Sequence, residues 1–184
     1  MLEKAKDGSS LPSGLFKIIA VDPSVSEDPK NADECGIMVL GSTRESDPRE
    51  RTIYLIEDMS IRATPDEWVE IIAETARKHR IRDVVVEKNQ GGALLRTVIT
   101  AKGADLKVHL VWASQGKVKR TEPIVVLMQQ GRVKFLDDFP NLEDQMIFYD
   151  PDDSKYSPDR LDAFAWGVTA LAVDTHKTLS LGVV

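Results

Sequence analysis

Two continuous β-rich runs separated by a helical stretch constrain the fold more than any other feature of this sequence. The run DVVVE spans residues 83–87, KVHLVW spans 107–112, and GALLRTVITAKG lies between them. Uninterrupted runs of this kind are typical of strands that are buried on both faces in a parallel sheet. Parallel neighbours need a crossover connection, which a helix supplies. The pattern therefore predicts a strand–helix–strand unit.

Three further β-rich runs precede this unit and follow one another closely. FKIIAVD begins at Phe16, CGIMVLG begins at Cys35, and RTIYLIEDMSI spans 51–61. Strands in such close succession predict an antiparallel meander. The meander and the parallel strands together predict an α/β domain, with one five-stranded mixed sheet and helices on both faces.

Helical signals account for much of the remaining sequence. Thr64, Pro65 and Glu67 form a capping box with proline at the first helical position, which predicts a helix over 65–79. Further helices are expected at about 119–130, around NLEDQMIFY, and from Pro158 to about Val173, with the short strand RVKFL before the second of them.

Composition indicates one globular domain. The chain has 184 residues, of which 42% are apolar and 29% charged. We expect the domain to span 15–175, preceded by a polar linker over 1–14 and followed by a tail over 176–184. No apolar run approaches the roughly 20 residues of a membrane span, and the N-terminus lacks the apolar core of a secretory signal, so we expect an intracellular protein with no membrane partner.

The supply of metal-binding side chains favours oxygen ligands. Cys35 is the single cysteine and the three histidines are scattered, which argues against an internal disulfide and a structural zinc site. Two acids end predicted strands: Asp22 ends the first and Glu87 the fourth. If these strands are parallel neighbours, both side chains emerge at the same carboxyl edge, where ligand sites of open α/β sheets lie. Asp159 and Asp162 share a face of the last helix and can point to that edge.

Clustered carboxylates repel one another unless a cation neutralises them, and carboxylate oxygens suit Mg²⁺ or Mn²⁺. One or two such ions would support phosphodiester hydrolysis without a protein nucleophile. Each acid alone has a structural explanation to weigh. Asp22 before Pro23 could be a turn residue, and Asp159 could stabilise the helix N-terminus. Glu87 and Asp162 are harder to explain in this way, and the occurrence of all four at element ends favours a site.

With these residues identified, the chain resembles the C-terminal nuclease domain of the large terminase subunit of tailed bacteriophages, within the RNase H-like superfamily. The resemblance spans nearly the whole chain. It rests on IIAVDPSVSEDPKNADECGIMVLG, VVVEKNQGG, SQGKVKRTEPIVVLMQQGRVKFLDDFPNLEDQM and SPDRLDAFAWG. It implies an RNase H-like sheet and a metal-dependent endonuclease that cuts concatemeric double-stranded viral DNA, using two Mg²⁺ or Mn²⁺ ions.

The resemblance also implies residue roles. Asp22, Glu87 and Asp162 are the expected catalytic residues, and the same three with Asp159 are the expected metal ligands. The other expected positions support a metal through water or contact DNA; they are Asp33, Asn89, Lys117 and Arg120.

A full large terminase subunit also carries an ATPase motor, and this sequence has no G-x-x-x-x-G-K-[ST] phosphate loop. We therefore expect an excised nuclease domain that does not hydrolyse ATP, with 1–14 descending from the interdomain linker. By resemblance its partners are double-stranded DNA, the ATPase domain, the small terminase subunit and the portal, in the cytoplasm of the host cell.

The net charge of −6 argues superficially against a nucleic-acid partner. Basic clusters nevertheless occur at RKHRIR (77–82) and KVKR (117–120), although either alone is more often a solvated surface.

Two functions remain open beside the terminase nuclease: an RNase H-like Holliday-junction resolvase, and a non-catalytic DNA-binding or docking module. Proofreading exonucleases need an Asp-x-Glu that Asp22-Pro23-Ser24 lacks, and actin-like ATPases need glycine-rich turns that DPSVSEDP lacks.

Overall fold

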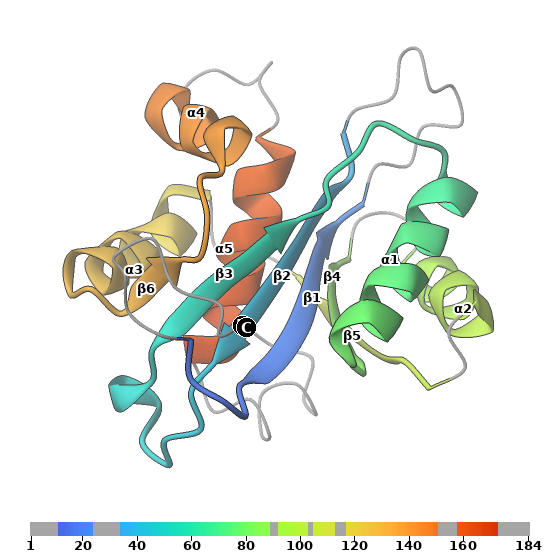
Figure 1. Cartoon of the computed structure of the whole chain (residues 1–184). Coiled ribbons are helices and arrows are strands. Elements are labelled where there is room, and N and C mark those ends of the chain that lie inside the picture. The colour runs from blue at the N-terminus through green and yellow to red at the C-terminus, as the bar shows by residue number, and fades with distance from the viewer. Residues whose placement is uncertain are drawn as a thin grey trace.

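A single six-stranded sheet forms the centre of the molecule, in the strand order β5-β4-β1-β2-β3-β6 (Figure 1). The computed structural model describes residues 11–23, 34–88, 92–102, 105–112, 117–150 and 158–172. The strands are β1 (Phe16–Asp22), β2 (Gly36–Ser42), β3 (Ile53–Asp58), β4 (Asp83–Glu87), β5 (Lys107–Val111) and β6 (Val133–Phe135).

The sheet is mixed, as the sequence predicts. Strands β1, β2 and β3 form the antiparallel meander, β4 pairs with β1 in parallel, and β5 pairs with β4 in parallel. The predicted number of five strands is wrong, because β6 adds a sixth at the edge, parallel to β3. This strand has only three residues, and nothing in so short a run distinguishes an isolated extended segment from one paired to a sheet.

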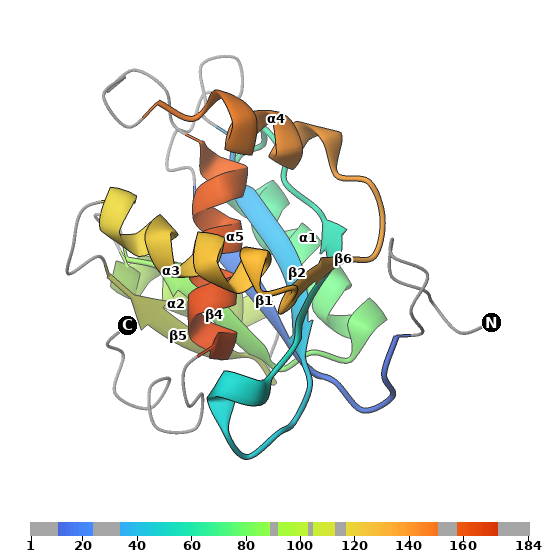
Figure 2. The same cartoon turned by 90° about the vertical axis from the view of Figure 1, so that its left-hand side faces the viewer.

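Helices cover both faces of the sheet (Figures 1 and 2). One face carries α1 (Pro65–His79) and α2 (Gly92–Lys102), and the other carries α3 (Lys117–Gln129), α4 (Pro140–Phe148) and α5 (Asp159–Ala172). A 3₁₀ turn, η1 (Pro48–Glu50), lies between β2 and β3. The helix predicted over 65–79 has those bounds, and the Thr64 backbone N–H donates to Glu67 Oε2 at 2.8 Å, as a capping box requires.

Side chains alternate between two apolar cores along the central strands. In β1, Ile18 and Ala20 contact the core beneath α5, whereas Ile19 and Val21 belong to the core beneath α1. This period of two follows from the pleat of a strand and buries both faces of β1. Trp68 is the largest fully buried side chain of the α1 core, and Phe164 is the largest fully buried side chain of the α5 core.

Helix α5 lies unusually close to β1 and β2, and two glycines permit this approach. A Cβ added at Gly36 would overlap the backbone carbonyl of Asp159, and one added at Gly167 would overlap the side chain of Leu40. Gly36 is also the strand partner of Asp22. The absence of these two side chains therefore brings the first turn of α5 against the strand ends where Asp22 lies.

Within the described segments, none of the helices combines the length and the apolar character that a membrane span needs.

Candidate functional site

The carboxyl ends of β1 and β4 bring two of the predicted acids together. Asp22 is the last residue of β1 and Glu87 is the last residue of β4. The two strands are parallel neighbours in a register that pairs Val21 with Val86, so the following residues emerge side by side. The N-terminus of α5, with Asp159 and Asp162, lies at the same edge of the sheet, the upper edge in Figure 1.

Three of the four carboxyl groups are buried. Asp22 and Asp159 are each 8% exposed, and Asp162 is 6% exposed. Burying a carboxylate is costly unless hydrogen bonds or an opposite charge compensate it. A simple turn or helix-cap role for Asp22 and Asp159 would leave these side chains in solvent, so their burial argues against the structural explanations.

The electrostatics of Asp22 show that the four acids form one interacting group, the carboxylate cluster. Burial raises the pKa of Asp22 well above its usual value, and the negative charges of Glu87, Asp162 and Asp159 raise it further. A hydrogen bond with Glu87 raises the pKa of Asp22 as well. Asp22 therefore interacts with all three of the other acids.

Trp166 fixes the orientation of Glu87. The indole Nε1–H donates to Glu87 Oε2 at 2.8 Å, and the indole is itself buried in the α5 core. Trp166 lies four residues after Asp162, on the same face of α5. Sequence reasoning missed this contact, although a tryptophan one turn from a predicted ligand was a usable signal, because a buried indole N–H needs an acceptor.

Arg160 anchors the first turn of α5 to the sheet. Its guanidinium donates from Nη1 to Asp58 Oδ2 at 3.0 Å and from Nη2 to Glu34 Oε1 at 2.7 Å. Asp58 ends β3 and Glu34 precedes β2, so one buried arginine ties α5 to two strands beside the carboxylate cluster. Sequence reasoning also missed this residue; a cation within an otherwise apolar helix was the available signal.

Backbone contacts complete the anchoring of α5. The backbone N–H of Leu161 donates to Gln145 Oε1 of α4 at 3.0 Å, and that of Asp162 donates to the Pro158 carbonyl at 2.8 Å. The positive end of the helix dipole lies at this first turn and favours negative charge there.

The donor set fits a hard divalent cation, but its geometry is not that of a finished binding shell. Carboxylate oxygens are the ligands that Mg²⁺ and Mn²⁺ prefer. Within the described segments, however, no three acidic, histidine or cysteine side chains already converge as a set of metal ligands. Because the pKa of Asp22 is raised, metal binding at this carboxyl group is coupled to the loss of its proton.

The remaining predicted positions cannot be placed. Asp33 and Asn89 lie outside the described residues, and so do the side chains of Lys117 and Arg120, whose backbone belongs to α3. The roles expected for these four residues stay predictions.

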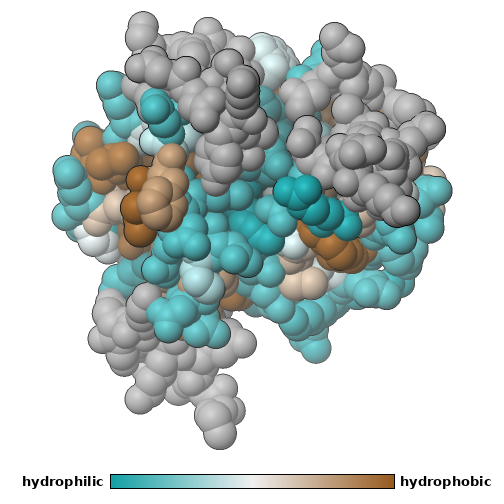
Figure 3. Space-filling view, turned by 90° about the horizontal axis from the view of Figure 1, so that it is seen from above, coloured by the Kyte–Doolittle hydropathy of each residue, from teal (hydrophilic) through white to brown (hydrophobic). Residues whose placement is uncertain are grey.

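A cleft of about 570 Å³ is formed by residues other than those of the cluster. Its lining includes Glu57, His79 and Asp137, from β3, α1 and the segment before α4. Viewed from above (Figure 3), the described surface at this end is largely hydrophilic, with hydrophobic patches to either side. Glu57 is already engaged, because it accepts from Lys78 and pairs with His79 at 2.6 Å each. The cleft contains none of the four acids of the cluster.

Comparison with protein families gives one match that covers most of the chain. The family model described as the terminase RNaseH-like domain matches residues 19–171. That span runs from β1 to the end of α5 and contains all four members of the carboxylate cluster. A search of curated proteins gives no match.

Solved structures share the fold at low sequence identity. The zinc-bound large terminase nuclease from thermophilic phage G20c has a TM-score of 0.60 and 17% identity, with 91% of this chain and 85% of that chain covered. The nuclease domain of the large terminase g2p from bacteriophage SPP1, with bound Mn, has a TM-score of 0.52 and 10% identity, with 83% and 85% covered. Thermus thermophilus RuvC has a TM-score of 0.51 and 13% identity, with 85% and 93% covered.

Proposed function

Because this chain belongs to the family of terminase RNaseH-like domains, we propose that it is a metal-dependent endonuclease that cuts concatemeric double-stranded DNA during viral genome packaging. The observation that carries the proposal is the carboxylate cluster. Four acids from three separate elements lie at one sheet edge, and burial together with the charges of the other three acids raises the pKa of Asp22. A protein that needed these acids only for stability would gain by replacing them.

The proposed ligands are Asp22, Glu87 and Asp162, with Asp159 as a fourth. Structures of the G20c nuclease with magnesium and of the SPP1 nuclease with Mn support a divalent ion here. Bound Mg²⁺ or Mn²⁺, as two ions, would activate a water and stabilise the leaving oxygen in phosphodiester hydrolysis.

The residues of this chain have distinct roles in that proposal. Asp22 and Glu87 supply carboxylate oxygens from the ends of two neighbouring strands. Trp166 keeps one Glu87 oxygen oriented, while Arg160 holds the helix turn that carries Asp159 and Asp162. Fixing ligands on strands and a packed helix limits the reorganisation needed for metal binding.

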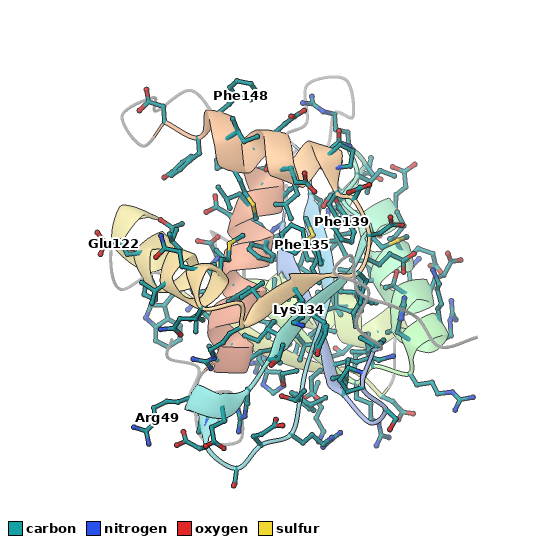
Figure 4. All side chains as sticks on the ribbon, turned by 60° about the vertical axis from the view of Figure 1, so that its left-hand side comes forward. Arg49, Glu122, Lys134, Phe135, Phe139 and Phe148 are labelled. Carbon is teal, nitrogen blue, oxygen red and sulfur yellow. The ribbon has the colours of Figure 1, made fainter. Side chains whose placement is uncertain are left out.

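Cleavage of supercoiled plasmid tests the proposal. The chain should nick and linearise plasmid with Mn²⁺ or Mg²⁺ and without marked sequence preference. Asp162→Asn and Glu87→Gln should each abolish cleavage, since an amide cannot replace an anionic ligand. Glu122→Gln is the matched control, because it removes one exposed acid from the outer side of α3 (Figure 4). Full activity in both site variants would overturn the assignment.

A Holliday-junction resolvase is the second candidate, because the fold also matches RuvC. A resolvase should cut four-way junctions much faster than linear duplex of the same sequence, whereas a terminase nuclease should cut both. We further propose that the chain works with an ATPase domain, a small terminase subunit and a portal, in the host cytoplasm. Copurification with these proteins would test that part separately.

A further inference from the structure

A basic surface lies at the end of the sheet opposite the carboxylate cluster. Two grooves of about 510 Å³ each shape this surface, and Arg80 and Arg82 line both of them. One groove lies between the ends of α1 and α2, and the other lies beside the start of β1. Six cationic side chains line the two grooves, and we call this set the basic edge: Lys17, Arg44, Arg77, Arg80, Arg82 and Lys102.

Charge is strongly segregated between the two ends of the sheet. Among the described residues, Asp83 and Asp105 are the carboxylates that line these grooves, and Glu70 pairs with Arg77 and Lys102; six cations against three anions leave an excess of three positive charges. The whole chain has a net charge of −6. The carboxylate cluster lies where β1 and β4 end, whereas the basic edge lies where they begin (Figure 1). The RKHRIR cluster of the sequence is thus part of a larger surface assembled from several elements.

The cations of the basic edge differ in how firmly they are held. Lys102 Nζ lies 3.0 Å from Glu70 Oε2, and Arg44 Nε donates to the Gly14 carbonyl oxygen at 2.8 Å. Arg77 and Glu70 are 3.9 Å apart, as are Arg82 and Asp105, and all four side chains are largely exposed. Exposed ion pairs at such distances contribute little to stability, so a ligand can readily replace the carboxylate partner. Arg80 is exposed, and in the described part of the chain its side chain has no ion pair.

The backbone of Arg80 adds a second observation. Arg80 caps α1 in the left-handed conformation, with φ 56° and ψ 46°, where glycine is favoured. An arginine near a helix C-terminus gains a little from the helix dipole. Arg80 nevertheless keeps this unfavourable backbone conformation at the junction of the two basic grooves. This conformation indicates that the guanidinium has a functional role there.

We propose that the basic edge binds the phosphate backbone of double-stranded DNA outside the cleaved phosphates. This inference rests on the proposed nuclease function. The seven residues of β1 span about 23 Å, so phosphates at the carboxylate cluster are not the ones that reach the basic edge. DNA flanking the cut, or a second DNA segment, is the proposed ligand.

DNA fits this surface for two physical reasons. Arginine forks match phosphate oxygens, and cations spread along adjoining grooves suit a polymer with regularly spaced negative charges. The proposed cleavage edge is itself acidic and repels DNA until metal binds. An attractive surface elsewhere on the chain would therefore raise the local concentration of DNA and supply much of its affinity.

Arg80→Gly tests the inference without threatening the fold, because glycine relieves the left-handed conformation. Binding of a labelled duplex several turns long is measured by fluorescence anisotropy without divalent metal, across a range of salt concentrations. Losing one phosphate contact should weaken binding about eightfold at about 0.1 M salt and lower the slope of log K against log salt by about one. Arg49→Gln is the control, since it removes one exposed positive charge outside both grooves (Figure 4).

The outcomes separate this inference from the nuclease proposal. Unchanged affinity and salt slope in Arg80→Gly, or an equal loss in Arg49→Gln, would overturn DNA binding at the basic edge. Binding of labelled polyglutamate is measured in the same way. If Arg80→Gly weakens polyglutamate binding but leaves DNA binding unchanged, the inference is also overturned, and an acidic protein partner is indicated. Failure of the nuclease proposal appears instead as absence of Mn²⁺-dependent cleavage by the unmodified chain, which the metal-free binding assay does not measure.

Discussion

Replacing Trp166 with phenylalanine removes one hydrogen-bond donor from the proposed metal site while keeping an aromatic ring in the core. The indole Nε1 lies 2.8 Å from Glu87 Oε2, which is a short distance for an N–H donor to a carboxylate. Hydrogen bonds to charged groups contribute about 1.5–3 kcal/mol. At about 1.4 kcal/mol per factor of ten, losing this bond should weaken Mn²⁺ binding by roughly 10- to 100-fold.

Isothermal titration of Mn²⁺ in the absence of DNA measures this effect directly. A smaller ring also leaves a cavity, so the unfolding free energy should fall as well, and that loss needs a control. Phe164→Leu supplies it, because Phe164 is fully buried on the same helix, and its ring centroid lies 5.8 Å from that of Phe135 in an edge-on arrangement. This control should lose stability but keep its affinity for Mn²⁺.

Two results would refute the reasoning about Trp166. One is parental Mn²⁺ affinity in Trp166→Phe, which would mean that the indole does not position Glu87. The other is an equal loss of Mn²⁺ affinity in both variants, which would mean that any damage to the α5 core disturbs the site.

Three further predictions concern the packing and charge of the site. Gly36→Ala should lower the unfolding free energy by about 1–3 kcal/mol in urea titrations, because the new methyl group overlaps the Asp159 carbonyl; an unchanged midpoint would contradict the close approach. Arg160→Met should cost about 3–5 kcal/mol by the same measurement, because it leaves two largely buried carboxylates unpaired; a loss below 1 kcal/mol would show that the pairs are weak. The pKa of Asp22 is raised above 3.8, so in metal-free buffer its contribution to stability is greatest below that pH and is lost as pH rises through the raised value. Mn²⁺ should therefore raise the melting temperature more at higher pH, and a pH-independent gain would exclude the cluster as the binding site.

The sequence was sufficient for most of the sheet and for the placement of Asp22 and Glu87 at one edge. The continuous apolar runs within FKIIAVD and DVVVE reflect burial on both faces, and strand polarity then places the two acids side by side. The capping box at Thr64 defines the start of α1 because capping is a local interaction between neighbouring residues.

Long-range contacts were the part that the sequence did not predict. Strand β6 pairs through three residues, and its partner β3 lies about eighty positions earlier in the chain. Trp166 and Arg160 act on Glu87, Asp58 and Glu34 only because Gly36 and Gly167 let α5 pack closely on the sheet. Such contacts depend on the distance between two packed elements, which residue periodicity does not specify.

A crystal structure of the chain grown with Mn²⁺ tests the central claim most directly. Anomalous difference density should locate manganese at the carboxylate cluster, coordinated by Asp22, Glu87 and Asp162, with the hydrogen bond between Asp22 and Glu87 broken. Manganese bound only elsewhere, such as in the cleft lined by Glu57 and Asp137, or no manganese at all, would contradict the account.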